Sequence, residues 1–588
     1  MKNSTEVYGP TIGISEEIHQ MKYRSVGESF KEAMTRVADA LKDDEKHFES
    51  FRDILYNMAF LPAGRVQSAM GAPRTVTPYN CFVSSTIEDS MNGIMTAAAE
   101  AARTMQLGGG IGYDFSTLRP HGALIRSLDS RSSGPMSFMG IFDAVCKTIA
   151  SAGHRRGAQM GVLRVDHPDI ETFIRAKNNS TDLTQFNMSV AVTDEFMQAV
   201  KDDTDFDLVF EGQVYKTVSA TALWDDILRS TWDWAEPGIL FIDRINQKNN
   251  LHYCETIAAT NPCGEQPLPP NGACLLGSFN LVKYVKHNGI QSGDTATFDY
   301  EKLKADIPHV VRAMDNVVDR ATYPLAKQEK EAKDKRRMGL GVTGLANAIE
   351  ALGFPYGSPD FMKTMEEIMR TIRDGCYRAS IELAKEKGPF PLYSHKLLDS
   401  DFAQTLPGDI RNDIGEYGIR NSHLLSVAPT GTISLSADNV SSGIEPVFSH
   451  YYDRTIQTFD GPRVERVEDY GVREFGVKGM AADALSVFDH VRVLNLASQY
   501  VDSACSKTCN VGDDVTWEQF KLVYMQAYDG GSSGCTTFRA SGKRYGILNA
   551  STSEDAAIET VVKPDAFVDE KEGGACYHDP ATGLRTCE

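Results

Sequence analysis

The stretch that decides both fold and chemistry is Asn261-Pro-Cys-Gly-Glu-Gln-Pro-Leu-Pro-Pro-Asn-Gly-Ala-Cys-Leu-Leu-Gly-Ser-Phe-Asn280. Prolines and glycines around Cys263 forbid a continuous helix or a central strand, so we expect this cysteine on a loop of fixed shape. Asn261 and Glu265 place an amide and a carboxylate within reach of whatever the cysteine attacks. Cys274 follows eleven residues later, where a turn could bring it near. The alternative is that both cysteines are small buried hydrophobes, which the proline-rich context disfavours.

A second informative segment is Ala428-Pro-Thr-Gly-Thr-Ile-Ser434. Small hydroxyl residues and a glycine before a helix start can present several backbone N–H groups to an anion, aided by the helix dipole. The pattern predicts a phosphate cradle, with an ordinary capped turn as the alternative. The run Gly108-Gly-Gly-Ile-Gly112 is similar but does not complete the GxGxxG spacing, so a plain tight turn is the simpler interpretation there.

Charge and composition exclude two classes of function. The chain has 588 residues, with 60 Lys and Arg against 80 Asp and Glu, and a formal net charge of −20, which argues against a general binder of nucleic acids or membrane surfaces. There is no run of about 18 uninterrupted apolar residues, and the polar start MKNSTEVYGP lacks a secretory signal pattern. An odd number of cysteines, 11, indicates a reducing compartment. We therefore expect a cytoplasmic enzyme.

Short β-rich runs alternate with amphipathic stretches through most of the chain. Residues 187–192 and 239–242 are predicted strands, and residues 223–234 and 361–387 are predicted helices. Such alternation favours a mostly parallel sheet wrapped by helices, which is an α/β fold.

The chain is expected to divide into three parts. Apolar residues at helical spacing predict an N-terminal helical segment over residues 1–59, and the α/β body occupies residues 60–550. Residues 551–588 are acidic, carry a Gly-Gly pair and end in two cysteines, so we interpret them as a flexible tail.

The remaining cysteines suggest different chemistry at two places. Around Cys505 and Cys509 the sequence predicts a helix, and no second cysteine or histidine pair completes a tetrahedral set, so we predict no metal site. Cys576 and Cys587 lie on the tail, and two thiols on a tether can enter a buried site and exchange with a disulfide there. The alternative for the tail is a frayed terminus with idle thiols.

A series of segments, taken together, resembles the large catalytic chain of ribonucleotide reductases. They follow in consistent order from residue 60 to residue 548, and their combination is highly specific. They are LPAGRVQSA, PYNCFVSS, IEDSMNGI, LGGGIGYDFSTLRP, RRGAQMGVL, NPCGEQPL, CLLGSFNL, RRMGLGVTGLANAI, APTGTISL and GCTTFRASGKR.

The resemblance implies a ten-stranded α/β barrel of two five-stranded parallel halves, with the reactive cysteine on a finger loop through its centre. It implies that Cys263 becomes a thiyl radical that removes hydrogen from C3′ of the ribose. Glu265 would take the 3′-hydroxyl proton, and Asn261 would bind the substrate near that hydroxyl. Cys81 and Cys274 would supply two electrons and a proton as the 2′-hydroxyl leaves as water, ending as a disulfide.

The same resemblance assigns further residues. Cys576 and Cys587 match the tail shuttle that reduces this disulfide, although their ten intervening residues exceed the family's usual spacing. A thioredoxin-like dithiol is the expected external reductant. The positions expected to bind substrate are Asn80, Pro429, Thr430, Gly431, Thr432, Ile433 and Ser434.

Regulation is implied as well. Asp89, Ser90 and Met91 match effector-binding positions on the helix that forms the family's dimer interface, where a deoxynucleotide or ATP effector selects the base to be reduced. Residues 153–157 and 178–185 fall where two specificity loops belong. We therefore expect a homodimer.

Members of the family differ in how they make the thiyl radical. Those that use a separate metal-bearing subunit carry two adjacent tyrosines late in the barrel, whereas residues 534–543 read GCTTFRASGK. The sequences of these motifs are similar to those of the adenosylcobalamin-dependent (class II) branch. Adenosylcobalamin is therefore the expected cofactor, and a class I catalytic subunit is the alternative. The glycyl-radical branch is disfavoured because the tail lacks its motif.

Two alternative functions make different predictions about which residues the sequence contains. A scaffold that kept the barrel but lost catalysis would lack Cys263, Glu265 or Cys81, and all three are present. A disulfide oxidoreductase acting through its tail would need a CxxC site beside a thioredoxin-like βαβ pattern, which is missing. Diphosphate and triphosphate substrates both stay open, because backbone donors suit either.

Overall fold

The structure is a computed structural model. It describes residues 8–151, 155–156, 158–178, 182–287, 296–458, 461–539, 541–542, 576–578 and 585–587.

Helices make up most of the regular structure. Their bounds are α1 (Gly13–Tyr23), α2 (Phe30–Leu41), α3 (Glu45–Tyr56), α4 (Gly64–Ala69), α5 (Met91–Gln106), α6 (Pro135–Thr148), α7 (Ile170–Ile174), α8 (Asp194–Asp202), α9 (Ala220–Trp234), α10 (Ile242–Lys248), α11 (Tyr300–Arg320), α12 (Ala326–Lys335), α13 (Leu345–Ala351), α14 (Pro359–Lys387), α15 (Asp401–Gln404), α16 (Gly408–Tyr417), α17 (Gly431–Ser436), α18 (Val487–Gln499) and α19 (Trp517–Asp529).

Eight strands form the larger sheet. In spatial order they are β15 (Ala273–Cys274), β2 (Cys81–Val83), β3 (Gly110–Asp114), β8 (Gln159–Arg164), β9 (Phe186–Val192), β12 (Gly238–Phe241), β23 (Gly534–Arg539) and β22 (Thr508–Val511). The run from β2 to β12 is parallel throughout. β23 is antiparallel to β12 and parallel to β22. The five parallel neighbours are buried on both faces, as parallel strands covered by helices usually are.

A smaller sheet contains β1 (Phe60–Pro62), β16 (Leu276–Asn280) and β19 (Gly339–Thr343), with β16 and β19 parallel. Single parallel bridges continue from it, Leu340 to Leu425 and Val427 to Cys505. The described residues thus form an eight-stranded and a three-stranded sheet, and the expected closed ten-stranded barrel is not confirmed. The physical reason is that residues around Leu425 and Val427 pair through isolated bridges instead of continuous ladders.

The remaining strands form short two-stranded antiparallel pairs. These are β4 (Leu124–Ile125) with β5 (Ser130–Arg131), β6 (Ala150–Ser151) with β7 (Arg155–Arg156), β10 (Asp205–Phe210) with β11 (Gln213–Ser219), β13 (Ala259–Thr260) with β14 (Pro267–Leu268), β17 (Val285–Lys286) with β18 (Thr297–Phe298), β20 (Tyr451–Thr458) with β21 (Gly461–Glu468), and β24 (Cys576–His578) with β25 (Arg585–Cys587).

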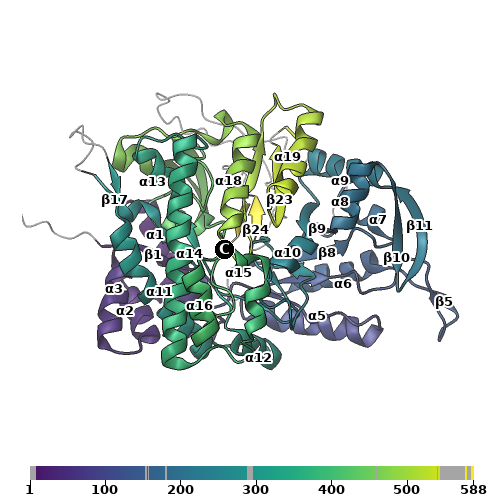
Figure 1. Ribbon diagram of the computed structural model, residues 1–588, viewed down its shortest axis with the longest axis horizontal. Helices are drawn as coiled ribbons and strands as arrows, with labels where there is room; N and C mark the ends of the chain where they lie inside the picture. Colours follow the sequence, from purple (N-terminus) through teal and green to yellow (C-terminus); the bar gives the residue numbers. More distant parts are fainter. Residues whose placement is uncertain are drawn as a thin grey trace, which may run out of the picture.

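Helices cover the strands from two sides. Figure 1 shows α11, α14 and α16 on one side of the molecule and α7, α8 and α9 on the other, with β8, β9 and β23 between them. One hydrophobic core surrounds the smaller sheet and includes Leu340 and Val342. A second core lies between the larger sheet and helices such as α5 and α9, and includes Tyr113 and Val190. The mixed α/β class predicted from the alternating pattern is confirmed.

The local predictions have mixed outcomes. The strands predicted at residues 187–192 and 239–242 are β9 and β12, and the helices predicted at 223–234 and 361–387 are α9 and α14. The helix predicted around Cys505 and Cys509 is wrong, because α18 ends before it and Cys509 lies on β22. Pairing with β23 decides the conformation there, a long-range contact that local periodicity does not encode.

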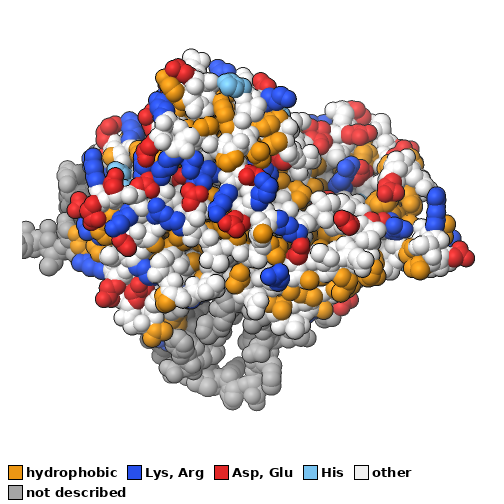
Figure 2. All heavy atoms as spheres, turned by 90° about the horizontal axis from the view of Figure 1, so that it is seen from below, with side chains coloured by type: hydrophobic (Ala, Val, Ile, Leu, Met, Phe, Trp, Pro, Cys, Tyr) orange, Lys and Arg blue, Asp and Glu red, His pale blue; other side chains and the backbone are white. Residues whose placement is uncertain are grey.

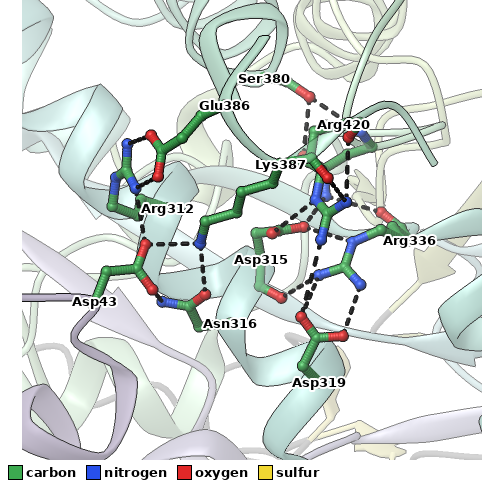
Figure 3. Close-up of polar contacts among 12 residues, drawn as sticks. Asp43, Arg312, Asp315, Asn316, Asp319, Arg336, Ser380, Glu386, Lys387 and Arg420 are labelled. Atoms are coloured by element: carbon green, nitrogen blue, oxygen red, sulfur yellow. Dashed lines mark hydrogen bonds and ion pairs between the residues drawn. The ribbon is translucent and has the colours of Figure 1, made fainter. Parts of the chain in front are cut away.

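A network of ion pairs joins the N-terminal helices to the segment before β19 (Figure 3). Asp315 on α11 is fully buried and accepts from Arg336 at 2.8 Å and from Arg420 at 3.2 Å. Arg336 also pairs with Asp319, whose side chain is 48% exposed. Asp43, between α2 and α3, binds Lys387 of α14 at 2.6 Å. Because Arg336 stands just before β19, this network fixes where that strand begins.

The outer surface carries charges of both signs. Figure 2 shows Lys and Arg side chains interspersed with Asp and Glu side chains over the face that it presents. Within the described part of the chain, none of the helices combines the length and the apolar character that crossing a membrane requires.

The network predicts a large stability difference between two neighbouring aspartates. Asp315→Asn leaves the buried Arg336 and the partly buried Arg420 without their shared carboxylate, so we expect a loss of about 3 kcal/mol in the free energy of unfolding. Asp319→Asn, at a half-exposed position, should cost less than about 1 kcal/mol. Urea denaturation of both variants measures the difference, and equal losses would contradict the role given to Asp315.

Candidate active site

The loop that carries Cys263 is a tight turn between β13 and β14. Its ends are tied together, since Asn261 N–H donates to the Gln266 carbonyl at 3.0 Å and Gln266 N–H donates to Asn261 Oδ1 at 2.9 Å. Gly264 N–H closes the turn on the Asn261 carbonyl at 3.0 Å. Gly264 has φ +82°, a conformation that only glycine adopts without strain. The turn therefore holds Cys263 and Glu265 in one fixed place.

Glycines on both sheets make room for this loop. A Cβ on Gly112 of β3 would lie 1.8 Å from the Thr260 carbonyl oxygen. A Cβ on Gly339 of β19 would lie 2.3 Å from Gln266 Nε2. The loop thus passes between the larger and the smaller sheet in direct contact with the backbone of each. This packing accounts for one glycine in each of the segments LGGGIGYDF and RRMGLGVTG, Gly112 and Gly339.

Two side chains and one backbone N–H from other parts of the chain hold the loop in place. Asn187 Nδ2 on β9 donates to the Pro262 carbonyl at 3.0 Å. The Glu265 carbonyl accepts from Ser426 Oγ at 3.1 Å and from the backbone N–H of Ala504 at 3.0 Å. These bonds satisfy the loop's buried backbone and leave its side chains to define the site.

Cys81 and Cys274 face each other across neighbouring strands. β2 and β15 are antiparallel, and Cys81 and Cys274 are direct Cα partners in their register. Both are free and buried. Directly opposite residues of an antiparallel pair have Cβ atoms about 4.5–5.5 Å apart, so a small approach brings two such cysteines to the separation of about 3.5–4.5 Å that a disulfide needs. The family resemblance implied that Cys81 and Cys274 act as a pair, and β-pairing provides their contact.

Burial keeps these two groups in the thiol form. Burial, followed by the negative charge of Glu265, raises the pKa of Cys81 to about 12. The same two causes hold the pKa of Cys274 well above its ordinary value. Glu265 therefore lies close enough to act on both thiols, and each keeps its hydrogen at neutral pH.

One pocket gathers most of the residues singled out from the sequence. Cys263, Glu265, Cys81 and Asn80 line it, and Asn80 Oδ1 is buried without a hydrogen-bond donor among the described residues. An unsatisfied buried oxygen at a pocket wall marks a place where a ligand can bond. The complete lining is Tyr23, Leu61, Ala63, Gly64, Asn80, Cys81, Cys263, Glu265, Leu276, Gly277, Ser278, Ala428, Pro429, Thr430, Thr432 and Ile433.

The other catalytic and substrate-binding residues predicted from the sequence do not line the pocket. Asn261 and Cys274 are fully buried behind the surface that Cys263 and Cys81 present. Gly431 and Ser434 belong to α17 without lining the pocket, and Ser434 Oγ bonds to the Gly431 carbonyl at 3.0 Å.

The segment predicted to bind phosphate has a strained residue at its start. Thr430 precedes α17 with φ 52°, a left-handed conformation that is unusual for threonine. Its hydroxyl oxygen accepts from Gly443 N–H at 2.7 Å and lies 3.0 Å from Thr343 Oγ1. Strain of this kind costs about 1–3 kcal/mol and collects at ligand sites. The bonds fix the backbone that faces the pocket.

Cys263 also borders a second cavity, which involves none of the phosphate segment. Serine and threonine hydroxyls dominate its polar lining, together with Lys507, which is paired with Glu445 at 2.6 Å. The complete lining is Met160, Ser189, Ile239, Leu240, Cys263, Gly264, Ala504, Cys505, Ser506, Lys507, Thr508, Gly534, Cys535 and Thr536. Cys263 thus stands between two cavities.

Cys263 is in a disulfide bond in this structure. The other cysteines whose side chains are described are free. A cysteine in a disulfide has no thiol hydrogen to give, so this is an oxidised state that a dithiol has to reduce before Cys263 reacts.

The residues expected to bind an effector lie at the start of α5. Ser90 caps the helix, its hydroxyl accepting from Gly93 N–H at 3.0 Å, and Asp89 pairs with Arg119 at 2.6 Å. Met91 and Met95 are 59% and 49% exposed. The specificity loops expected at 153–157 and 178–185 lie partly outside the described residues.

The tail contributes only two short strands to the described structure. β24 and β25 are antiparallel with Cys576 and Cys587 as direct Cα partners, so a hairpin accounts for their ten-residue separation. β25 packs against α17, and Figure 1 shows β24 near the centre of the molecule. The side chains of both strands and the rest of the tail lie outside the described residues.

Tyr23 and Ser278 line the pocket but were not predicted from the sequence. Ser278 stands inside the segment CLLGSFNL, so its place in a motif was an available signal. Tyr23 lies far upstream, in an amphipathic helix with no chemical pattern, and only tertiary packing brings it to the site.

The sequence of this chain is similar to those of known proteins. Residues 79–484 match the family described as "Ribonucleotide reductase, barrel domain". The match covers more than half of the 588 residues and includes both cysteine strands, the loop of Cys263 and the segment at Thr430. This chain belongs to the ribonucleotide reductase family.

Named relatives agree with the family. The chain is similar to the "Vitamin B12-dependent ribonucleoside-diphosphate reductase" of Mycobacterium tuberculosis, with 34% identity over 532 residues that cover 85% of this chain and 73% of that protein. The protein of the same name from Thermoplasma acidophilum is 31% identical over 611 residues, covering 96% of this chain and 76% of that protein. The "Ribonucleoside-diphosphate reductase large subunit" of vaccinia virus is 28% identical over 421 residues, covering 64% and 53%. The resemblance that the motifs indicated is confirmed.

The packing of this loop in the reductase fold predicts the effect of one methyl group. Gly112→Ala places a Cβ against the Thr260 backbone oxygen, which has to move, so we expect a loss of about 1–3 kcal/mol in stability and at least tenfold lower turnover. Gly140→Ala is the matched control, since a Cβ there meets nothing within 4 Å. Thermal unfolding and steady-state assays compare the two variants, and normal turnover by Gly112→Ala would contradict the threading of the loop.

Proposed function

We propose that this chain reduces ribonucleotides to 2′-deoxyribonucleotides by thiyl-radical chemistry, with the radical generated from adenosylcobalamin. The observation that carries the proposal is a single pocket that combines Cys263, Glu265 and Cys81 with the segment around Thr430. A thiol that can give and take a hydrogen atom, a carboxylate base and a phosphate-facing turn together suit a nucleotide's sugar and phosphates.

Cys263 as a thiyl radical removes the hydrogen atom from C3′ of the ribose. Glu265 takes the proton of the 3′-hydroxyl, and Asn261 positions the substrate near that hydroxyl. Both Glu265 and Asn261 are at most 1% exposed, so little water competes for these contacts. Exclusion of water also protects a reactive radical from side reactions.

Cys81 and Cys274 supply the reducing equivalents. The C2′–O bond breaks, the oxygen leaves as water, and two thiols become one disulfide, which balances the two-electron reduction. Their raised pKa values support this role, because a thiol carries the hydrogen that the product needs. Cys576 and Cys587 then exchange with the new disulfide, and a thioredoxin-like dithiol reduces the tail.

The second cavity beside Cys263 has a lining whose chemistry suits a nucleoside group. Hydroxyls of Ser189, Ser506, Thr508 and Thr536 line it, and such groups donate to and accept from the hydroxyls and ring nitrogens of a nucleoside. When bound there, adenosylcobalamin would supply the radical chemistry that converts the Cys263 thiol into a thiyl radical. The residues that would hold its nucleoside part are these four hydroxyl side chains, and Lys507 fixes the strand that carries Thr508.

Two further observations favour the cobalamin branch over a class I subunit. The relatives from Mycobacterium tuberculosis and Thermoplasma acidophilum are named as vitamin B12-dependent and align over more of this chain than the viral large subunit does. The segment at β23 carries no pair of adjacent tyrosines. The names also favour nucleoside diphosphates as substrates.

The architecture is proposed to be the family's ten-stranded barrel of two five-stranded halves, preceded by residues 1–59 and followed by a redox-active tail at 551–588. Support comes from five consecutive parallel strands and from the bridges beyond β19. The substrate positions are proposed to be Asn80, Pro429, Thr430, Gly431, Thr432, Ile433 and Ser434.

A homodimer with an effector site at α5 completes the proposal. Asp89, Ser90 and Met91 would bind a deoxynucleotide or ATP at the helix start. The two exposed methionines on α5, Met91 and Met95, support an apolar contact between copies of this helix.

The test is to incubate the purified chain with a ribonucleoside diphosphate, an effector and dithiothreitol, with and without adenosylcobalamin. We expect deoxynucleotide only when cobalamin is present. Cys263→Ser should abolish turnover while nucleotide binding stays within about twofold of wild type, because serine holds its hydrogen too strongly to exchange it yet fills nearly the same space. Product that forms only with an added metal-bearing subunit would overturn the cobalamin assignment, and repeated turnover by Cys263→Ser would overturn the radical assignment.

A further inference from the structure

The first helix of the chain is built against the helix that follows the phosphate segment. Ser15 Oγ on α1 donates to the Leu435 carbonyl of α17 at 2.5 Å. Thr11 N–H donates to Asp438 Oδ1 at 2.6 Å. Ile14, Ile18, Leu435 and Val467 form one small hydrophobic cluster across the contact. α1 therefore packs at a defined position on α17, although α1 precedes the residues that match the family.

The last residue of α1, Tyr23, reaches the substrate pocket. Tyr23 is only 3% exposed and lines the pocket together with Gly64 and Thr430. A Cβ on Gly64 would lie 2.4 Å from Tyr23 Cε1 and 3.1 Å from Cζ, the carbon that bears the hydroxyl. The hydroxyl end of the ring thus lies over Gly64, where any larger residue would displace it.

Neighbouring side chains hold the Tyr23 ring rigidly. His19 packs edge-on against it at 5.3 Å between ring centroids. Burial lowers the pKa of His19 to about 3, so this neighbour is uncharged. Arg24, next in the chain, donates to His19 Nδ1 at 3.0 Å and pairs with Glu16. A ring fixed in this way loses little further freedom when a ligand arrives.

The position of the ring identifies the part of the ligand that it meets. α1 packs against α17 and α4, so Tyr23 lies at the end of the pocket formed by those helices. Thr430 and Thr432, on either side of the α17 start, face the same pocket. This is the phosphate end in the proposed function, on which the inference depends.

We propose that Tyr23 closes the phosphate end of the pocket, donates a hydrogen bond to the terminal phosphate of a nucleoside diphosphate, and excludes a third phosphate. A phenol hydroxyl is a good donor to an anionic oxygen, and a ring held over Gly64 at the end of the pocket stands where a third phosphate would extend. The N-terminal helix thereby becomes a determinant of substrate class.

Binding of cytidine mono-, di- and triphosphate to the reduced full chain, measured by equilibrium dialysis at one effector concentration, tests this assignment. Wild type should bind the diphosphate best. Tyr23→Phe should weaken diphosphate binding about tenfold through the lost charged hydrogen bond while leaving monophosphate binding unchanged. Tyr23→Ala should open the pocket and reduce the preference for diphosphate over triphosphate at least fivefold. In turnover assays KM should rise for the diphosphate while kcat stays the same.

Tyr56→Phe is the matched control, because Tyr56 bonds to Thr35 Oγ1 at 2.7 Å and does not line the pocket. It should bind all three nucleotides as wild type does. If Tyr23→Ala is poorly folded by thermal unfolding, Tyr23→Phe alone decides through its diphosphate and monophosphate affinities. If wild type prefers the diphosphate and the Tyr23 variants keep that preference, the role given to Tyr23 is wrong while the proposed function stands. Wild type that binds diphosphate and triphosphate equally would also overturn that role, and wild type that binds none of the three would overturn the proposed function as well.

Discussion

The constraint on which the rest of the structure depends is the close passage of residues 261–266 between two sheets. Gly112 on β3 lets the loop's backbone approach, and Gly339 on β19 lets the side chain of Gln266 approach, to distances that any larger residue would block. Asn261 and Gln266 then close the loop on itself. The ion pairs of Asp315 also help to position the smaller sheet around the loop, because they fix the chain just before β19. Position, not intrinsic reactivity, distinguishes Cys263 from the other thiols.

This placement explains how one small pocket can combine radical and redox chemistry. Cys263 stands between a cavity rich in hydroxyls and the pocket of Cys81. The β2–β15 register places Cys274 directly opposite Cys81. Burial keeps both thiols protonated, and the carboxylate of Glu265 reinforces that effect. Hydrogen-atom transfer needs thiols, whereas nucleophilic chemistry would need thiolates, so the electrostatics of the site agree with the proposed reaction.

Local sequence predicted the parts of the site that depend on proline, glycine and hydroxyl patterns. The loop at Cys263 and the helix start after Thr430 belong to this group. It failed around Cys509, where pairing with β23 outweighs local periodicity. It did not find Tyr23, because an amphipathic helix gives no sign of which residue will reach a distant pocket. The opposition of Cys576 and Cys587 likewise depends on a hairpin register that spacing alone does not show.

The central claim is that the Cys263 thiol exchanges a hydrogen atom with the cofactor on one side and the ribose on the other. The most direct test uses adenosylcobalamin labelled with tritium at the 5′ carbon and follows label released into water, since thiol hydrogens exchange with solvent. The account predicts release by wild type and by Cys274→Ser, which keeps Cys263, and none by Cys263→Ser. Release by Cys263→Ser at the wild-type rate would contradict it.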